Sequence, residues 1–395
     1  MRCLTLLGST GSIGVSTLDV VRRWPGRFSI FALVAGRNAE LLASQIREFR
    51  PHLVVVESDA VRADLIARLD IPKSEHPSIE TDPSYRVAAA TAPECDFVLS
   101  AIVGVEGLQA TYQAIRAGKQ VGLANKEVLV ASGKLVMEAA RAAGTELIPV
   151  DSEHNGAHQA LRCGRRDEVH RLILTASGGP FRNTPVEELA NVTPAQALAH
   201  PTWKMGQRIT IDSSTMMNKG FEVIEACWLF GLSPDEVDVV VHPSSSVHAM
   251  VEYLDGSLMA QISTTDMRMP IQYAMTYPER WSALVPRMDW TEPRTLEFFP
   301  PDLSKFHCLR LAYQALRAGG SATCTLNAAD EVAVEAFLGG EISYPGIAEV
   351  VAETLERAPA REPESVEEVL EIDRQSRAAA RQIVTERRKG AGVIA

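Results

Sequence analysis

The sequence has few of the residues that mark a secreted, membrane-bound or nucleic-acid-binding protein. Its six cysteines are scattered and form no C-x-x-C pair, which disfavours a disulfide framework and a zinc site. Lys and Arg number 39 against 50 Asp and Glu, and the net charge of −11 disfavours a surface for nucleic acid or anionic lipid. No apolar run is long enough to span a bilayer. We therefore expect a globular protein with neither a membrane nor a nucleic-acid partner.

The first residues predict a strand and no signal segment. Residues 2–8 read RCLTLLG, with no charged stretch, apolar stretch or cleavage site before them. Together with the scattered cysteines, this predicts a cytoplasmic protein with reduced thiols. A chain of 395 residues is too long for one compact core and suits two or three domains.

Short β-branched runs alternate with amphipathic segments over residues 1–150, a pattern typical of βαβ units and a parallel sheet. Six strands are expected there, in CLTLLG, FSIFALVAG, HLVVVES, DFVLSAIVG, KQVGLAN and TELIPVDS. The pattern predicts an α/β protein whose N-terminal domain, residues 1–150, is Rossmann-like and binds a dinucleotide.

The pattern changes after residue 150. Strands of a second sheet are expected in HRLILTASGGPF, RITIDSS, VDVVVHPSSSVHAMVEY and SLMAQIST, with a helix over 215–230. We predict a central α+β domain over 151–276 and a linker over 277–303, which is rich in Pro, Trp and charge. Amphipathic segments then predict a helical C-terminal domain over 304–395.

A glycine-rich turn, LLGSTGSIG, follows the first strand. Gly8, Gly11 and Gly14 permit close backbone approach, and the helix after them offers free N–H groups to a pyrophosphate. Their G-x-x-G-x-x-G spacing departs from the commoner G-x-G-x-x-G, so a glycine turn without a ligand stays an alternative. The residues that we expect to bind the cofactor in this turn are Thr10, Gly11, Ser12 and Ile13.

Two further strand ends carry candidate cofactor residues. Gly36, Arg37 and Asn38 follow the second strand, where an NAD site usually has an acid. A guanidinium suits a 2′-phosphate, so NADPH is favoured over NADH, with a solvated surface arginine as the alternative. The segment LANKE follows another strand at the edge of the sheet where ligands bind. Its polar residues, expected at the nicotinamide ribose and the substrate, are Asn125, Lys126 and Glu127.

The segment PVDSEHNG places two acids where a strand ends. In an extended chain Asp151 and Glu153 would share one side while Ser152 points away. Two carboxylates ~4 Å apart repel by about 4 kcal/mol at an effective dielectric of ~20, so a proton or a cation must offset them. Oxygen ligands favour Mg²⁺ or Mn²⁺. An acidic turn at a domain boundary is the alternative, and we expect His154 to be a hydrogen-bonding turn residue.

A third acid lies in IDSSTMMNKGFEVIEA. One of the polar residues 212–214 is expected to cap a helix, on which Asn218, Lys219 and Glu222 lie together. A helix rises ~1.5 Å per residue, so Glu222 is about 6 Å along the axis from Asn218. That separation suits a phosphate at Asn218 and Lys219 and a metal at Glu222. An ordinary surface Lys–Glu pair is the alternative.

Two polar loops complete the candidate site. Ser177 and the two glycines after it end a strand and suit an anion-binding nest. The segment AHPTWKMGQR has little periodicity and is predicted to be a mobile lid with an aromatic cover. Its candidate residues are His200, Trp203, Lys204, Met205 and Gly206. A loop tryptophan that anchors a core is the alternative.

These segments together resemble the 1-deoxy-D-xylulose 5-phosphate reductoisomerase family. LGSTGSIG, LANKE, PVDSEHN, SGGPF, HPTWKMG and DSSTMMNKGFEVIEA occur in the family's order, and similarity continues through DMRMPI and TLNAADEVAVEAF. The resemblance implies a homodimeric enzyme with NADPH-binding, catalytic and helical domains. It implies that the substrate, a sugar phosphate, is rearranged with Mg²⁺ or Mn²⁺ and reduced by NADPH to 2-C-methyl-D-erythritol 4-phosphate, in non-mevalonate isoprenoid synthesis.

The resemblance also implies roles for residues that match the family's motifs. The implied metal ligands are Asp151, Glu153 and Glu222. The implied phosphate-binding residues are Ser177, Ser213, Asn218 and Lys219. The residues implied to contact the rest of the substrate are Lys126, Ser152, His200 and Trp203, the last two on the closing loop. Gly206 joins the candidate cofactor-binding residues.

Two departures from the family's pattern stand out. Gly156-Ala157-His158 replaces bulkier apolar residues after the acidic motif, which affects packing under the metal. Arg37 replaces an expected lysine and keeps the charge. Two rivals stay open at this point: another NADP-linked dehydrogenase of a small phosphorylated substrate, which leaves the three acids unexplained, and a catalytically silent NADP-binding regulator, which predicts eroded acids.

Overall fold

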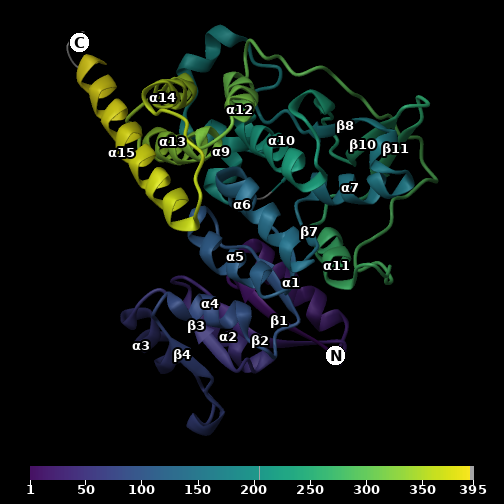
Figure 1. The fold of residues 1–395 in the computed structure, drawn as a ribbon, viewed down its shortest axis with the longest axis vertical. Coiled ribbons are helices and arrows are strands. Elements are labelled where there is room, and N and C mark those ends of the chain that lie inside the picture. Colours follow the sequence, from purple (N-terminus) through teal and green to yellow (C-terminus); the bar gives the residue numbers. More distant parts are fainter. Residues whose placement is uncertain (204, 392–395) are drawn as a thin grey trace. The chain divides into compact units, whose positions relative to one another are not determined.

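The protein is described here by a computed structural model that covers residues 1–203 and 205–391 (Figure 1). The chain divides into two compact units, each made of several segments. Unit 1 comprises Met1–Val128, Val136–Asn155 and Asp266–Arg287. Unit 2 comprises Leu129–Leu135, Gly156–Thr265 and Met288–Ala395. Among the described residues no helix combines the length and the apolar character needed to cross a membrane.

Unit 1 is built on a seven-stranded, fully parallel sheet in the order β4-β3-β2-β1-β5-β6-β7. Its strands are β1 (Arg2–Leu7), β2 (Phe28–Val34), β3 (Leu53–Val55), β4 (Ser78–Glu80), β5 (Phe97–Ser100), β6 (Gln120–Leu123) and β7 (Leu147–Pro149). Its helices are α1 (Ser12–Arg23), α2 (Ala39–Phe49), α3 (Asp59–Arg68), α4 (Ser84–Thr91), α5 (Leu108–Arg116) and α11 (Arg268–Thr276). The predicted parallel sheet of an α/β fold is confirmed.

The core of unit 1 explains why this segment folds as it does. Leu4, Leu6 and Leu99 are fully buried in the central strands, as expected for strands covered on both faces. The α11 helix comes from much later in the sequence, yet it packs on β6, β7 and α1. The prediction of six strands missed β4, because SIE has three residues, two of them polar, and lacks the apolar alternation of a longer strand.

Unit 2 contains a four-stranded sheet in the order β11-β10-β8-β9. Its strands are β8 (Val169–Ala176), β9 (Val237–Val241), β10 (Val247–Tyr253) and β11 (Leu258–Ile262). The β8 and β9 strands are parallel, while β10 is antiparallel to both β8 and β11. The helices before and beside this sheet are α8 (Pro194–Ala197), α9 (Gln207–Thr215) and α10 (Met217–Phe230). The second sheet is therefore confirmed, apart from one expected strand.

That strand, RITIDSS, was predicted wrongly, because the structure folds it as α9. Its β-branched residues suggested a strand. In the structure Ile211 is fully buried, and the Thr210 hydroxyl donates to the Gly206 carbonyl at 2.8 Å. The Arg208 guanidinium donates to Glu331 at 2.8 Å, on another helix. Tertiary contacts of this kind override a local preference for strand.

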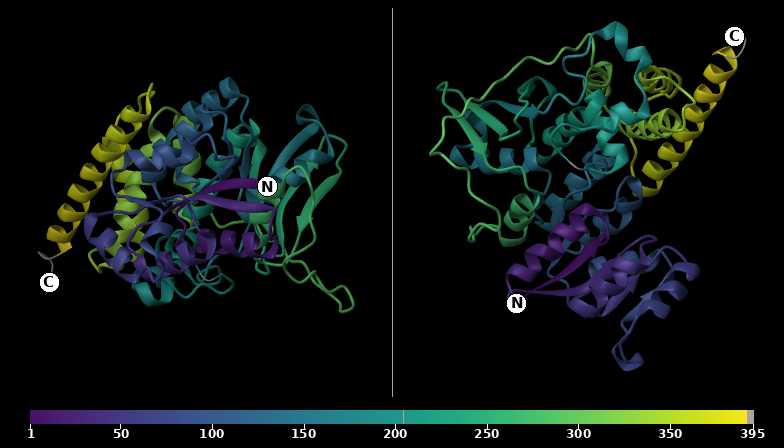
Figure 2. Two further views of the ribbon diagram at one scale, coloured as in Figure 1. Left: turned by 90° about the horizontal axis from the view of Figure 1, so that it is seen from below. Right: turned by 180° about the vertical axis from the view of Figure 1, so that it is seen from behind.

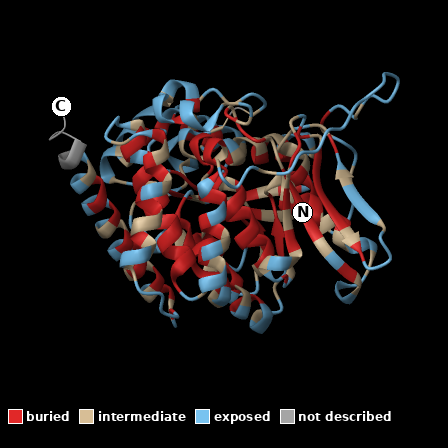
Figure 3. Ribbon diagram, turned by 90° about the horizontal axis from the view of Figure 1, so that it is seen from above, coloured by how far each residue is buried: buried red, intermediate tan, exposed pale blue. Residues whose placement is uncertain are grey.

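Four helices complete unit 2: α12 (His307–Ala318), α13 (Ala322–Leu338), α14 (Tyr344–Arg357) and α15 (Val366–Ala391). Leu326, Ala329 and Ala333 of α13 are fully buried, and α15 packs along α13 and α14 (Figure 2). Buried and exposed residues alternate along α15 with the period of an amphipathic helix (Figure 3). The predicted helical C-terminal region is confirmed.

Two helices belong to both units. The α6 helix (Glu127–Ala143) contributes its residues 129–135 to unit 2, and α7 (Ser152–Ala160) begins in unit 1 and ends in unit 2. The predicted linker contains no helix and no regular strand among its described residues, although Phe299 forms an isolated bridge with Val241.

Candidate active site

The glycine-rich turn joins β1 to α1 and is shaped by steric limits on its backbone. Gly8 has φ +97°, and a Cβ there would lie 2.5 Å from the Ala101 carbonyl oxygen. A Cβ on Gly14 would lie 2.4 Å from the carbonyl oxygens of Gly8 and Ser9. Gly11 is the N-cap of α1 without a side-chain cap, so the first amides of the helix are offered to the turn. The turn has the backbone of an anion-binding site.

The end of β2 presents the predicted arginine to solvent. The Arg37 side chain is 83% exposed and donates two hydrogen bonds to Glu57, at 2.7 and 2.8 Å. The Arg37 guanidinium lowers the pKa of Glu57 by these hydrogen bonds. Asn38 caps α2 by accepting from the Leu41 amide at 3.1 Å. Arg37 is thus oriented by a carboxylate that sequence reasoning did not identify, since Glu57 lies on the neighbouring strand's end.

The residues after β6 have two different roles in the fold: Asn125 makes buried hydrogen bonds to a neighbouring loop, and Lys126 forms an ion pair. Asn125 is buried and donates to the carbonyl oxygens of Ile102 and Gly104, the latter at 2.9 Å, so it ties down a neighbouring loop. The Lys126 ammonium pairs with Asp151 at 2.9 Å, and both side chains are largely buried, 8% and 14% exposed. Glu127 is the first residue of α6. The pair brings LANKE and PVDSEHNG together within unit 1.

The predicted geometry of the acidic segment was wrong, because its residues are not extended. Ser152 and Glu153 form the first turn of α7, and the Asp151 carboxylate accepts from the backbone amides of Glu153 and His154 at 3.1 and 3.4 Å. Asp151 is therefore the N-cap, which satisfies amides that a helix start leaves free. The Ser152 hydroxyl donates to Glu153 at 2.8 Å.

The helix that carries the third acid starts differently from the prediction. Residues 212–214 lie inside α9, and the N-cap of α10 is Met216, in the left-handed conformation with φ +60°. The Glu222 carboxylate has no exposed surface, and it accepts from Asn218 at 2.6 Å and pairs with Lys219. The two predicted phosphate donors are therefore turned onto Glu222 instead of lying apart from it. A buried carboxylate requires such partners.

Ser177, His200 and Ser213 form a cluster in unit 2. The His200 Nε2 atom lies 3.1 Å from the hydroxyl oxygens of both Ser177 and Ser213. The His200 Nδ1 atom accepts from the backbone amides of Thr202 and Trp203, so the neutral ring carries its proton on Nε2. Burial lowers the pKa of His200 and favours this neutral form. We call these three residues the Ser–His–Ser cluster.

The loop that contains the cluster's histidine is only partly described. Trp203 is half-buried and its backbone amide is held by His200, while Gly206 is the N-cap of α9. Lys204 lies outside the described residues. A Cβ on Gly179 would lie 2.9 Å from the Ser213 carbonyl oxygen, so the SGG turn approaches α9 at its backbone.

Of the three acids that the family resemblance implies as metal ligands, Asp151 and Glu153 lie at the start of α7 in unit 1, and Glu222 lies on α10 in unit 2. We call these residues the carboxylate group. Their donor set is oxygen alone, which suits a hard cation such as Mg²⁺ or Mn²⁺. Lysine ammonium groups contact two of the three carboxylates, as expected where negative charges must be offset. The residues present therefore fit a divalent cation.

One polar network near the loop was missed by sequence reasoning. Arg208 donates to Asn327 and Glu331 of α13, both at 2.8 Å, and lies 3.5 Å from Asp212. Burial and the nearby Asp212 raise the pKa of Asp330 well above its usual range. The segment TLNAADEV carried these polar residues at buried helix positions, which was the signal available.

Comparison with known proteins gives a consistent set of relatives. Three family models match: 1-deoxy-D-xylulose 5-phosphate reductoisomerase over residues 4–133, the C-terminal domain of that enzyme over 147–230, and the DXP reductoisomerase C-terminal domain over 262–379. A 1-deoxy-D-xylulose 5-phosphate reductoisomerase from Solibacter usitatus is 64% identical over 393 residues, 99% of each chain. The enzyme of that name from Chlorobaculum tepidum is 50% identical, over 97% of this chain and 100% of its own.

Solved structures agree with the sequence relatives. The reductoisomerase from Zymomonas mobilis in complex with NADPH has a TM-score of 0.90 and 42% identity, and the match covers 97% of this chain and 99% of that one. A DOX-P reductoisomerase in complex with NADPH, fosmidomycin and magnesium has a TM-score of 0.89 and 38% identity, over 98% of each chain.

Proposed function

The chain belongs to the 1-deoxy-D-xylulose 5-phosphate reductoisomerase family, and from this premise we propose how its own residues carry out the family's reaction. The protein is an NADPH-dependent reductoisomerase that converts 1-deoxy-D-xylulose 5-phosphate to 2-C-methyl-D-erythritol 4-phosphate, with a divalent cation such as magnesium. The observation that carries the residue assignments is that acids in both units are paired with largely buried lysines, Asp151 with Lys126 and Glu222 with Lys219. The division into domains over 1–150, 151–276 and 304–395, with a linker over 277–303, is part of the proposal.

The carboxylate group is assigned to the metal. Asp151, Glu153 and Glu222 would hold the cation, which would stabilise negative charge on substrate oxygens during the rearrangement. Lys126, whose ammonium pairs with Asp151, is assigned to the substrate. Ser152 stands between the two acids, at the first turn of α7, and is assigned to a substrate hydroxyl.

The phosphate is assigned to the Ser–His–Ser cluster together with Asn218 and Lys219. These residues offer hydroxyl, imidazole, amide and ammonium donors from neighbouring segments of unit 2. The Nε2 proton of neutral His200 donates, because Nδ1 is occupied by two backbone amides. Phosphate binding at a loop can supply the energy that closes it. Trp203 would then cover the substrate and exclude water.

The cofactor is assigned to the edge of the unit 1 sheet. Residues 10–13 offer the amides of the turn and of the α1 N-terminus to the pyrophosphate. Arg37, flanked by Gly36 and Asn38, is assigned to the 2′-phosphate, which would replace Glu57 as its partner. Asn125, Glu127 and Gly206 are assigned to the nicotinamide end. NADPH supplies the hydride of the reduction.

The assay that tests this function follows NADPH absorbance after addition of 1-deoxy-D-xylulose 5-phosphate and Mn²⁺. We expect absorbance to fall only with both present, and to stay constant with EDTA. Turnover that persists in EDTA would support a metal-independent dehydrogenase and contradict the assignment of the carboxylate group.

The protein's assembly and location are further parts of the proposal. The β11 strand is hydrogen-bonded to β10 alone within its sheet and exposes Leu258, Met259 and Ile262. An exposed apolar edge strand of this kind is expected to be covered, and we assign it to a homodimer interface. Met259→Lys should shift the sedimenting species from dimer to monomer, and a monomeric wild type would refute the assignment.

The six free cysteines support a reducing, cytoplasmic location, which cell fractionation tests.

A further inference from the structure

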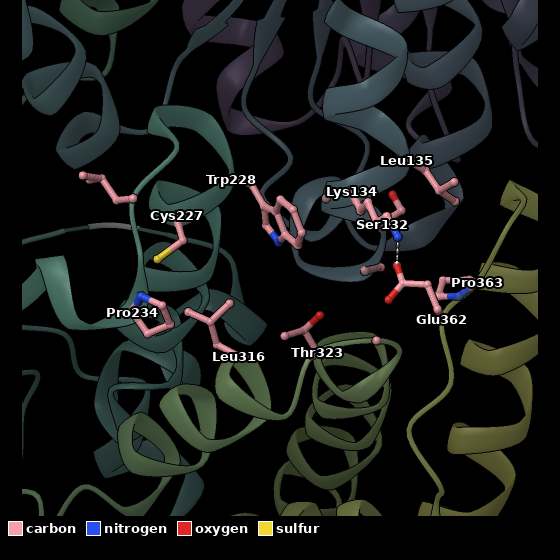
Figure 4. Close-up of a pocket in the computed structure, with 15 residues that line it drawn as sticks. Ser132, Lys134, Leu135, Cys227, Trp228, Pro234, Leu316, Thr323, Glu362 and Pro363 are labelled. Carbon is pink, nitrogen blue, oxygen red and sulfur yellow. Dashed lines mark ion pairs between the residues drawn. The ribbon is translucent and has the colours of Figure 1, made fainter. Parts of the chain in front are cut away.

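A pocket lies within unit 2, and its lining residues have no role in the proposed reaction. It has a volume of about 340 Å³ and is formed by the middle of α6, the end of α10, the turn between α12 and α13, and the segment before α15 (Figure 4). The side chains that face it and matter here are Ser132, Lys134, Trp228, Leu316, Thr323 and Glu362. Cavities of this size accommodate small organic ligands and are too small for a helix of another protein.

The shape of the pocket depends on a glycine of α6 that lets a tryptophan of α10 pack closely against it. Ser132 interrupts α6 with non-helical angles, φ −145° and ψ 29°. Next to it, a Cβ on Gly133 would lie 2.3 Å from the Trp228 ring, so only glycine lets the indole seat there. Gly320, at φ +55°, turns the chain between α12 and α13, and a Cβ there would make a tight contact of 3.0 Å with the Arg361 carbonyl oxygen. The walls are therefore fixed by backbone geometry.

The body of the pocket is apolar. Trp228, Leu232 and Leu316 supply indole and aliphatic surface. Burial raises the pKa of Cys227 to about 12, so its thiol stays protonated and adds to the apolar wall. Figure 4 shows the nitrogen-bearing edge of the Trp228 ring and the Thr323 hydroxyl turned toward the open space. A flat apolar group fits such a wall and leaves these donors for a polar edge.

One end of the pocket carries an ion pair whose cation is accessible to an incoming anion. Lys134 pairs with Glu362 at 3.2 Å, and the two side chains are 49% and 47% exposed. Lys134 belongs to α6, while Glu362 lies in a segment outside any helix or strand. An exposed ion pair is weak, so an incoming carboxylate or phosphate can replace Glu362 at Lys134. Among the polar side chains that line the pocket, Trp228 and Lys134 can only donate hydrogen bonds, and Glu362 can only accept them. A ligand that accepts hydrogen bonds therefore finds more partners than one that donates them.

We propose that this pocket is a binding site for a small molecule with a flat apolar body and a single anionic head, either a carboxylate or a phosphate ester. The body lies against Trp228 and Leu316, and the head takes the place of Glu362 at Lys134, with Ser132 and Thr323 as hydroxyl partners. The site is separate from the carboxylate group: Trp228 follows Glu222 by six residues on α10, about 9 Å along the helix axis.

The test compares two probes that share a body and differ in charge. Isothermal titration calorimetry of the full-length protein, in EDTA and without NADPH or substrate, measures binding of 2-naphthoate and of 2-naphthylmethylammonium. We expect 2-naphthoate to bind once per chain and the ammonium to bind at least about tenfold more weakly. Equal or tighter binding of the ammonium, or no binding of 2-naphthoate, would overturn the proposal.

Variants localise the binding. Lys134→Gln removes the ammonium from an exposed position, so the protein should keep its melting temperature while the Kd for 2-naphthoate rises at least about tenfold. Trp228→Leu should weaken binding similarly. Lys73→Gln and Trp290→Leu are matched controls at exposed sites elsewhere and should leave the Kd unchanged. An unchanged Kd in Lys134→Gln would overturn the assignment. Glu222→Gln should bind 2-naphthoate as the wild type does, so failure of the proposed function would leave this result intact.

Discussion

The glycine turn and the carboxylate group are two parts of the candidate site that are built by different means. The turn owes its shape to backbone geometry, since Gly8 and Gly14 sit where a Cβ would clash with carbonyl oxygens. The residues of the carboxylate group are held by charge within each unit, since Lys126 pairs with Asp151 and Lys219 pairs with Glu222. The turn should therefore be sensitive to side-chain size and indifferent to charge, and the carboxylate group should show the reverse.

The largest effect is expected from a change of charge in the carboxylate group. Glu222→Gln keeps the size and the hydrogen bond from Asn218 but removes the proposed metal ligand, so Mn²⁺-dependent turnover should fall at least about a hundredfold. The variant should remain folded, with a lower melting temperature, because Lys219 loses a buried partner. Steady-state kinetics and thermal unfolding measure both. Glu252→Gln, at a surface ion pair, is the control. Near-normal turnover with Mg²⁺ would exclude Glu222 as a ligand.

The second-largest effect is expected from a larger side chain in the glycine-rich turn, and it should change the affinity for NADPH. Gly14→Ala places a Cβ 2.4 Å from two carbonyl oxygens, and overpacking of this kind costs about 1–3 kcal/mol. The Kd for NADPH should rise about fivefold to a hundredfold, with Mn²⁺ affinity unchanged. Gly11→Ala, whose Cβ would meet only the Gly8 oxygen at 3.5 Å, should retain the stability of the wild type. Equal stability losses in the two variants would contradict the steric account.

The next effect concerns Arg37, whose positive charge is assigned to the 2′-phosphate of NADPH. Arg37→Gln should raise the Michaelis constant for NADPH about tenfold and leave that for NADH nearly unchanged, since a hydrogen bond to a charged group is worth about 1.5–3 kcal/mol. Glu57→Gln frees the guanidinium from its present partner and should not weaken NADPH binding. Equal effects of Arg37→Gln on the two cofactors would refute the assignment to the 2′-phosphate.

The smallest effect is expected from the pH dependence of the Ser–His–Ser cluster. Burial lowers the pKa of His200 below 6.5, so the neutral ring is favoured in the folded protein. Its contribution to stability is complete above the unfolded pKa and decreases as pH falls from 6.5 toward the folded pKa. The urea midpoint of the wild type should fall more between pH 7.5 and 5.5 than that of His200→Gln. Parallel curves would show that His200 is not the group responsible.

The sequence predicted the parts whose signal is local. The βαβ alternation gave the parallel sheet, and the amphipathic periods gave the C-terminal helices. It failed where tertiary contacts decide the local structure. RITIDSS reads as a strand by composition, but Arg208 is anchored to α13 and Ile211 is buried, so the segment is a helix. The short β4 strand has no periodic signal at all.

In the candidate site too, local features could be predicted from the sequence and long-range pairings could not. The residue types and their order were visible in the motifs, including the three acids. Their pairing was not: neither the Lys126–Asp151 pair nor the Glu57 partner of Arg37 follows from spacing, because each joins residues twenty or more positions apart. Asp151 was expected in an extended segment, yet it caps α7, because a helix start needs an acceptor for its free amides.

The central claim is that the carboxylate group holds the divalent cation. Crystals grown with Mn²⁺ and NADPH, measured at the manganese absorption edge, test it directly through the anomalous difference map. We predict one strong peak within coordination distance of carboxylate oxygens from Asp151, Glu153 and Glu222. No peak at these residues, or a peak bound by other side chains, would contradict the account.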